Sequence, residues 1–340
     1  MGRSFIRRLR SRWESCVTGD ERPRVGLVLP VFNDWDSLRL VLDDLEVFYS
    51  GDYDLHLCVV NDGSTSNDPD PLTLARFESL EVVNLGANLG HQRAICVGLV
   101  RLADRGHFDA LVVMDSDGED SVAAVGALLE PVLTGAADVV VAERTSRSEG
   151  RRFRAFYSLY KFLFRVLTGE RLDFGNFSAL SARALDRMVY MPDLWNHYPG
   201  TLMRSRLAIT RIPVARLSRL RGSSKMDLAS LTTHGLSGLS VFVDRIFARL
   251  LILVGIAGLV LLAAVGAGLV ARLALQVPIA GWLALLTTAA FIGLIQLLGT
   301  LAVLAFVSLS MRARFSPHPS EFAASFVRDV TGESRRDTHE

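Results

Sequence analysis

The sequence lacks any strong net charge. Its 340 residues carry 37 Lys and Arg side chains against 36 Asp and Glu side chains. A protein that binds nucleic acid normally has a clear basic excess, so this balance argues against nucleic acid as a partner. A chain of this length has room for one large domain or two modest ones.

Cysteines and glycine-rich nucleotide motifs are also scarce. Cys16, Cys58 and Cys96 are far apart and form no C-x-x-C pair, which argues against a disulfide framework or a zinc site and fits a reducing cytosol. No G-x-G-x-x-G follows the first apolar run, and the segment GSSK at 222–225 lacks the upstream glycine of a P-loop. Dinucleotide oxidoreductases and P-loop phosphotransferases are therefore disfavoured.

Charged residues are absent from two runs in the C-terminal third. The first, 250–270, would span about 30 Å as a helix, which matches a bilayer core. The second, 279–311, is longer, and its membrane part is expected near 282–306. The link 271–278 is too short for a domain, so the pattern predicts a transmembrane hairpin. The alternative is two buried helices of a soluble core.

The arginines around these runs indicate an orientation. Arg245 and Arg249 precede the first run, Arg312 and Arg314 follow the second, and the link carries only Arg272. The positive-inside rule then places both ends of the hairpin in the cytoplasm, with the protein in the cytoplasmic (inner) membrane. The N-terminus has no apolar core, so we expect no signal peptide there.

Residues 24–143 alternate short apolar runs with stretches of helical period. This alternation predicts a mainly parallel sheet covered by helices on both faces. The expected strands are Val25–Val31, Leu55–Val60, Leu80–Leu85, Ala110–Met114 and Asp138–Ala142, and the expected helices are Ser37–Phe48, Gln92–Ala103 and Val122–Leu133.

Polar clusters follow three of these strands: PVFND at 30–34, NDGST at 61–65, and DSDGED at 115–120. Ligands bind at the carboxyl ends of parallel strands, so these clusters are the candidate site. The four carboxylates of 115–120 repel one another unless a cation lies among them. Mg²⁺ or Mn²⁺, bridged to a substrate phosphate, would fit. A solvated acidic turn that caps the following helix is the other interpretation.

These clusters, together with NLGHQRAICVGL at 88–99, resemble in order and spacing the inverting family 2 glycosyltransferases over about residues 24–235. Within that family the chain is most similar to the polyprenyl-phosphate hexosyltransferases, a group that contains dolichyl-phosphate mannose synthase and bacterial undecaprenyl-phosphate glucosyltransferases. Three shorter segments carry the likeness to this group: AERTSR at 142–147, DFGNFS at 173–178 and RGSSKM at 221–226.

The resemblance implies an α/β nucleotide-diphospho-sugar transferase (GT-A) fold with a mainly parallel sheet, followed by the two-helix hairpin. The expected parts are a basic N-terminal tail (1–23), a cytosolic glycosyltransferase domain (24–225), an amphipathic juxtamembrane segment (226–249), two transmembrane helices (250–311) and a cytosolic tail (312–340).

The resemblance also implies roles for single residues. Pro30, Asn33 and Asp62 would line the base and ribose pocket, Asp115 would lie near the ribose and the metal, and Asp117 and Glu119 would be metal ligands. The residues expected to hold the lipid phosphate and the donor diphosphate are Arg144, Arg147, Arg221, Ser224 and Lys225. Of all these, Asp117, Arg144 and Arg221 are the predicted catalytic residues. Asp117 would act through the metal, and the guanidinium groups of the two arginines match phosphate geometry.

The implied reaction is inverting transfer of a hexose or N-acetylhexosamine from a nucleotide sugar, UDP- in preference to GDP-, to a polyprenyl phosphate. A phosphate nucleophile is largely ionised at neutral pH and needs no general base. Asn176 stands where relatives often have aspartate, and Ala87 where they often have arginine, whose contacts His91 and Gln92 could replace. The expected partners are the donor, the lipid acceptor and the membrane. Homo-oligomerisation stays open.

Two alternatives remain. A membrane glycosyltransferase could instead act on a glycan acceptor, although the Q-x-x-R-W motif expected of a processive polysaccharide synthase is absent from the sequence. A non-catalytic membrane scaffold with a decayed sugar-nucleotide fold would have lost the acidic residues at the strand ends, whereas these are present.

Overall fold

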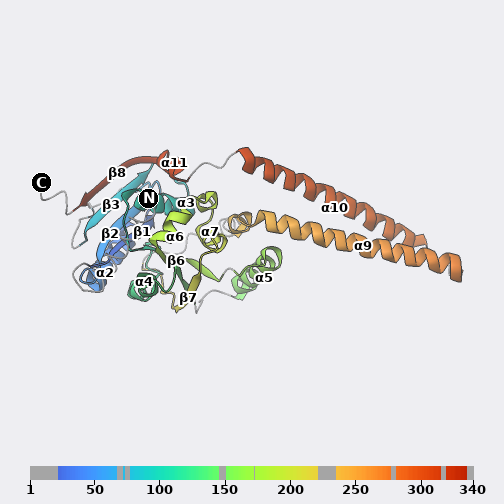
Figure 1. Cartoon of the computed structure of the whole chain (residues 1–340), viewed down its shortest axis with the longest axis horizontal. Coiled ribbons are helices and arrows are strands. Elements are labelled where there is room, and N and C mark those ends of the chain that lie inside the picture. Colours follow the sequence, from blue (N-terminus) through green and yellow to red (C-terminus); the bar gives the residue numbers. More distant parts are fainter. Residues whose placement is uncertain are drawn as a thin grey trace, which may run out of the picture. The chain divides into compact units, whose positions relative to one another are not determined.

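The computed structural model describes residues 22–66, 72, 77–144, 151–171, 173–220, 235–276, 281–314 and 319–334. It divides into two compact units. The first contains Met1–Arg154, Leu172–Val241 and Pro317–Glu340, and the second contains Ala155–Arg171 and Phe242–Ser316. Figure 1 shows the elements of both units.

The first unit is built on an eight-stranded sheet with the order β7-β5-β6-β4-β1-β2-β3-β8. Its strands are β1 (Arg24–Val31), β2 (Asp54–Asn61), β3 (Ser79–Leu85), β4 (Ala110–Val113), β5 (Val139–Arg144), β6 (Phe174–Ser181), β7 (Ile209–Val214) and β8 (Val327–Ser334). Strand β6 runs antiparallel to β4 and β5, and β8 runs antiparallel to β3, while the other pairs are parallel. The predicted mainly parallel sheet is confirmed.

Helices cover both faces of this sheet (Figure 1). They are α2 (Trp35–Tyr49), α3 (His91–Arg105), α4 (Val125–Leu133), α6 (Ala182–Met188), α7 (Tyr198–Arg204) and α11 (Pro319–Ala324), with short 3-10 helices η1 (Val122–Ala124) and η2 (Pro192–Trp195). One apolar core joins the sheet to α2 and α4, and a second joins it to α3, α6 and α7. Burial on both faces explains why the central strands are continuous apolar runs rather than alternating ones.

The strand order reverses at β1. From β1 the chain continues to β2 and β3 on one side and then crosses to β4 on the other side of β1. The carboxyl ends of β1 and β4 are therefore neighbours at a topological switch point, where open α/β sheets bind their ligands. The predicted polar clusters at 30–34 and 115–120 follow these two strands.

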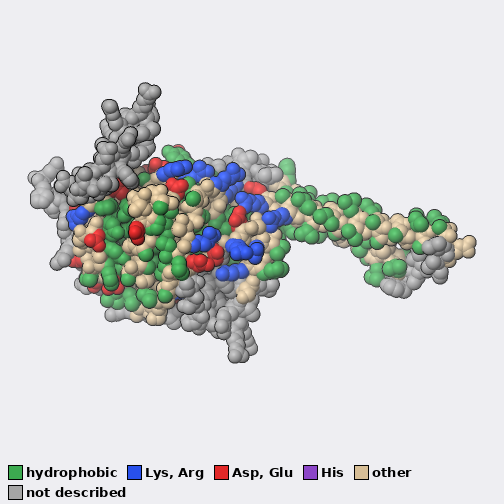
Figure 2. Space-filling view, turned by 60° about the horizontal axis from the view of Figure 1, so that its bottom comes forward, with side chains coloured by type: hydrophobic (Ala, Val, Ile, Leu, Met, Phe, Trp, Pro, Cys, Tyr) green, Lys and Arg blue, Asp and Glu red, His purple; other side chains and the backbone are tan. Residues whose placement is uncertain are grey.

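The second unit contains two long apolar helices, α9 (Val243–Leu275) and α10 (Gly281–Arg314), which contact each other. Segments of 32 residues, Val243–Ala274, and 25 residues, Leu283–Val307, are long and apolar enough to cross a membrane. Their described surface is mainly hydrophobic (Figure 2), as expected of helices that face lipid on all sides. The unit also includes most of α5 (Arg151–Thr168), whose Phe164 ring packs on Phe242 just before α9.

After α10 the chain returns to the first unit. Strand β8 pairs with β3, for example Thr331 with Val82, and α11 lies against α3. The sequence predicts a cytosolic tail over 312–340, without β8 or α11. Because β1 and β8 belong to one sheet, the segments before α9 and after α10 lie on the same side of any membrane that both helices cross.

We predict that Gly63→Ala destabilises the first unit. Gly63 has φ +65°, and a Cβ would lie 2.5 Å from the carbonyl carbon of Ala87 and 2.6 Å from the nitrogen of Asn88, backbone atoms that cannot rotate away. Such strain costs about 1–3 kcal/mol, so the apparent melting temperature in detergent should fall by roughly several degrees. The control is Gly51→Ala, because nothing lies within 4 Å of its Cβ position. Equal melting of the two variants would contradict this.

Candidate active site

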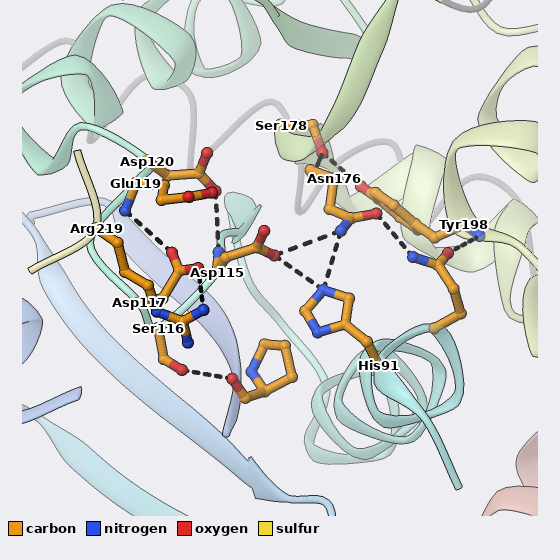
Figure 3. A network of polar contacts seen from close by, with 12 residues as sticks. His91, Asp115, Ser116, Asp117, Glu119, Asp120, Asn176, Ser178, Tyr198 and Arg219 are labelled. Atoms are coloured by element: carbon orange, nitrogen blue, oxygen red, sulfur yellow. Dashed lines mark hydrogen bonds and ion pairs between the residues drawn. The ribbon is translucent and has the colours of Figure 1, made fainter. Parts of the chain in front are cut away.

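The residues Asp115–Asp120, here called the acidic turn, follow β4. Gly118 has φ +78°, which lets the chain reverse at this point. The Asp120 carboxylate accepts the N–H of Asp115 at 3.0 Å, and Asp117 accepts the N–H of Glu119 at 3.0 Å. Ser116 Oγ donates to the carbonyl of Pro30 at 2.7 Å and so ties the turn to β1. The turn is therefore fixed largely by its own side chains (Figure 3).

The carboxylates of the acidic turn lie close enough to repel one another. Burial raises the pKa of Asp117, and the neighbouring charges of Asp115 and Glu119 raise it further. Within the described residues, no group of three Asp, Glu, His or Cys side chains is arranged to hold an ion alone. Mg²⁺ is typically held by one or two carboxylates together with substrate phosphates, so Asp115 and Asp117 fit an ion shared with a diphosphate. The Glu119 carboxylate is instead ion-paired with Arg216.

His91, the first residue of α3, reaches the acidic turn. Its Nε2 lies 2.9 Å from Asp115 Oδ1. Loss of solvent around the ring lowers the pKa of His91, although its side chain is 42% exposed. The attraction and hydrogen bond of Asp115, together with the charges of Asp117 and Asp120, outweigh this effect, so the pKa of His91 is raised. Asn176 Nδ2 from β6 lies 3.0 Å from the same His91 nitrogen and 3.4 Å from Asp115 Oδ1. The ring and the amide together orient the Asp115 carboxylate (Figure 3).

Gln92 holds this arrangement in place. Its Nε2 donates to Asn176 Oδ1 at 3.0 Å, and its Oε1 accepts the N–H of Tyr198 at 2.7 Å. The Tyr198 hydroxyl lies 2.6 Å from Ser178 Oγ, which closes a polar chain from α3 through α7 to β6. The sequence indicated Asn176 as a departure from a family pattern, and His91 and Gln92 as residues that could replace the contacts of an arginine missing at Ala87. No sequence signal indicated Tyr198.

Asn33 and Asp62, predicted to line the nucleotide pocket, build the loops at this edge of the sheet. Asn33 Oδ1 accepts the N–H groups of Thr65 at 2.9 Å and Ser66 at 3.0 Å. Asp62 is buried, and its two oxygens accept the N–H groups of Leu89 at 2.7 Å and Gly90 at 3.0 Å. These contacts connect the loops after β1, β2 and β3, so both residues shape the edge on which the acidic turn lies.

Sequence reasoning missed the six residues 215–220 that follow β7, here called the basic strap. Arg219 Nη2 donates to Asp34 Oδ2 at 2.7 Å, and Arg219 Nη1 lies 4.0 Å from Asp117 Oδ2. Together with the Arg216–Glu119 pair, these contacts bring two guanidinium groups to the acidic turn. Clustered arginines beside Arg221 were the available signal, but the sequence does not show which carboxylates they reach.

Most residues predicted to bind phosphate lie outside the described part of the chain. Arg144 is the last residue of β5, at the same edge of the sheet as the acidic turn, but its side chain lies outside the described part. Arg147, Arg221, Ser224 and Lys225 lie outside the described residues altogether.

Comparison with known proteins identifies the domain. Residues 27–193 match the model of the family described as glycosyl transferase family 2. These residues are a family 2 glycosyl transferase domain. The acidic turn, His91 and Asn176 all lie within the matched part, and the predicted family is confirmed. The chain is therefore an enzyme of the glycosyltransferase class.

Curated relatives match beyond this glycosyl transferase domain. The bactoprenol glucosyl transferase of Shigella phage SfV is 25% identical over 288 residues, which cover 81% of this chain and 90% of that protein. A prophage bactoprenol glucosyl transferase homolog of Escherichia coli (strain K12) is 25% identical over 235 residues, 66% of this chain and 74% of that protein.

A solved structure shares the fold of the glycosyl transferase domain. The crystal structure of glucosyl-3-phosphoglycerate synthase from Mycobacterium tuberculosis, in complex with Mn²⁺, UDP-glucose and phosphoglyceric acid, has a TM-score of 0.51 and 19% identity. The match covers 69% of this chain and 83% of that chain. The predicted GT-A fold is thereby confirmed.

We predict that Asp62→Asn lowers both stability and donor affinity. An amide has a single acceptor oxygen, so its NH₂ group would face the N–H of Leu89 or Gly90, and a buried donor left unpaired costs about 1–3 kcal/mol. Thermal melting and titration with UDP would measure the two effects. The matched control is Asp43→Asn on the exposed side of α2, which should behave as wild type. An Asp62→Asn variant that melts and binds like wild type would refute the anchoring role.

Proposed function

We propose that this enzyme transfers a hexose or N-acetylhexosamine from a nucleotide sugar, UDP- in preference to GDP-, to a polyprenyl phosphate, with inversion at the anomeric carbon. The observation that carries the proposal is that one chain combines the acidic turn, at the switch point of the sheet, with two long apolar helices. The relatives that align with 81% of the chain, at 25% identity, include bactoprenol glucosyl transferases. This likeness supports the same class of acceptor here.

The donor would bind at the acidic turn. Asp115 and Asp117 would hold Mg²⁺ or Mn²⁺ together with the diphosphate, and the ion would neutralise charge on the departing nucleoside diphosphate. The structural neighbour glucosyl-3-phosphoglycerate synthase was solved with UDP-glucose and Mn²⁺, which supports a nucleotide sugar bound together with a divalent cation here. We expect Pro30, Asn33 and Asp62 to shape the side of the pocket that takes the base and ribose.

The acceptor would need cations rather than a base. An oxygen of the lipid phosphate forms the bond to the anomeric carbon, while the bond from that carbon to the diphosphate breaks and its electron pair leaves with the nucleoside diphosphate. Asn176 is a neutral amide engaged by Gln92 and His91, so it orients Asp115 and takes no proton. Arg144, Arg147, Arg221, Ser224 and Lys225 would hold the phosphate oxygens.

Helix α5 supports a lipid acceptor. Phe162, Leu163 and Val166 are exposed on it, while Arg249 of α9 donates to the carbonyl of Val166 at 2.8 Å. Exposed apolar side chains beside Lys161 and Arg165 are typical of a helix that lies in a membrane interface. The sequence predicts this role for 226–249, of which residues 226–234 lie outside the described residues.

We predict that Arg144→Ala and Arg221→Ala strongly reduce transfer to undecaprenyl phosphate, while Asn176→Ala has less effect. A contact from an arginine to a shielded phosphate contributes roughly 1.5–3 kcal/mol, or about ten- to over a hundredfold in rate. Transfer from radiolabelled nucleotide sugars would be measured, with free undecaprenol as the control acceptor. Equal transfer to the free alcohol, or full activity of both arginine variants, would favour a glycan acceptor instead.

We predict that Ser50 and Ser320 face the cytoplasm and Gln276 faces the opposite side. The reason is the arginine distribution around α9 and α10, together with the shared sheet of β1 and β8. Ser50→Cys, Ser320→Cys and Gln276→Cys would be labelled with a membrane-impermeant reagent in a Cys16→Ser background, since Cys58 and Cys96 are buried. Labelling of Ser320→Cys and Gln276→Cys from the same side would reject the hairpin.

A further inference from the structure

The segment that follows α10 packs on α3, the helix whose first residues reach the acidic turn. Helix α11 lies against α3 (Figure 1), and the Ala323 side chain is 2% exposed in the core that includes α3. The rings of Phe322 and Phe326 meet Trp195 of η2 at centroid distances of 4.9 Å and 5.4 Å, and their own centroids lie 5.3 Å apart. Trp195, Phe322 and Phe326 are here named the aromatic clasp.

The aromatic clasp contacts the first turn of α3 through Arg93. The guanidinium carbon of Arg93 lies 5.6 Å from the centroid of the Trp195 ring, within the range of a cation–π interaction. Arg93 follows His91 and Gln92, which build the polar network beside the acidic turn (Figure 3). Gly90 precedes the helix and has no side chain to cap it. Contacts with other segments therefore position this first turn.

The same segment fastens the loop 86–90, which connects β3 to α3. The N–H of Gly86 donates to the carbonyl of Phe326 at 3.0 Å. At the other end of the loop, the N–H groups of its last two residues donate to the Asp62 carboxylate. The loop is thus held at one end by a residue expected in the nucleotide pocket and at the other end by the aromatic clasp.

We propose that the aromatic clasp positions the first turn of α3 for sugar transfer, with Trp195 as its central positioning residue. The Trp195 ring contacts Phe322, Phe326 and Arg93, so its loss would release α3 from the segment after α10. Only residues 315–318 separate α10 from α11, so the clasp also connects the chain that leaves the second apolar helix to the active site. This inference rests on the proposed function.

The competing explanation is that the aromatic clasp only adds stability. Its rings bury apolar surface, and β8 pairs with β3, so the segment could be a passive cover for the edge of the sheet. In that case, loss of the clasp would lower the melting temperature and leave the turnover of the folded enzyme unchanged. A positioning role instead lowers turnover at temperatures where every variant is folded.

The test compares substitutions of Trp195 in the full-length protein in detergent with Mn²⁺. Transfer of labelled sugar to undecaprenyl phosphate would be measured well below the melting temperature of each variant. Trp195→Leu should lower kcat by about tenfold, while KM for the nucleotide sugar changes by less than about twofold, because no group that binds the donor is removed. Trp195→Phe keeps an aromatic face for Arg93 and should recover most of the lost turnover.

The matched control removes an equivalent contact at the opposite edge of the sheet. Arg24 begins β1, and its guanidinium carbon lies 5.6 Å from the centroid of the Phe108 ring, the same distance as in the pair of Arg93 and Trp195. Phe108 precedes β4, so this pair lies at the amino ends of the strands, away from the acidic turn. Phe108→Leu should lower the melting temperature at least as far as Trp195→Leu and leave kcat unchanged.

Amide hydrogen exchange tests the same contact without any substrate. Trp195→Leu should speed exchange of the amides in the loop 86–90 by roughly tenfold, whereas Phe108→Leu should not. Unchanged exchange of the loop, unchanged kcat, or equal loss of kcat in the two variants would overturn the inference. If the wild-type protein transfers no sugar to undecaprenyl phosphate, the proposed function fails, and exchange of the loop alone then decides whether the clasp positions α3.

Discussion

Repulsion among the carboxylates at the ends of β1 and β4 is the constraint on which the rest of the site depends. Asp34, Asp115, Asp117 and Glu119 are stable together only if positive charge lies among them. The protein supplies part of that charge through Arg216 and Arg219 of the basic strap. The remainder fits a divalent cation that arrives with the donor diphosphate.

The fold keeps this cluster in place with polar contacts that sequence motifs alone do not describe. Asn33 and Asp62 accept hydrogen bonds from backbone N–H groups of the loops at the sheet edge. Gln92 donates to Asn176 through Nε2 and is itself held by the N–H of Tyr198 at its Oε1. Such contacts hold side chains in one geometry, which the proposed transfer without a general base requires. The neutral amide of Asn176 suits a nucleophile that is already ionised.

The sequence predicted those parts whose signal is local. Strands β1 to β5 are buried on both faces and read as apolar runs, and the pair Asp115 and Asp117 stands directly after one of them. Strand β8 could not be predicted because it is an edge strand with exposed, polar side chains such as Asp329. Contacts between distant segments could not be predicted either. Arg219 and Asp34 are 185 positions apart, and neither segment carries a sequence signal that it pairs with the other.

The most direct test of the account is transfer of a labelled sugar to undecaprenyl phosphate by Asp117→Asn, compared with Asp44→Asn on the exposed side of α2. If the acidic turn holds the cation and the diphosphate, loss of one charge at Asp117 should abolish transfer while the folded protein melts as wild type. The Asp44→Asn variant should be fully active. Unchanged turnover of Asp117→Asn at saturating Mn²⁺ and Mg²⁺ would contradict the account.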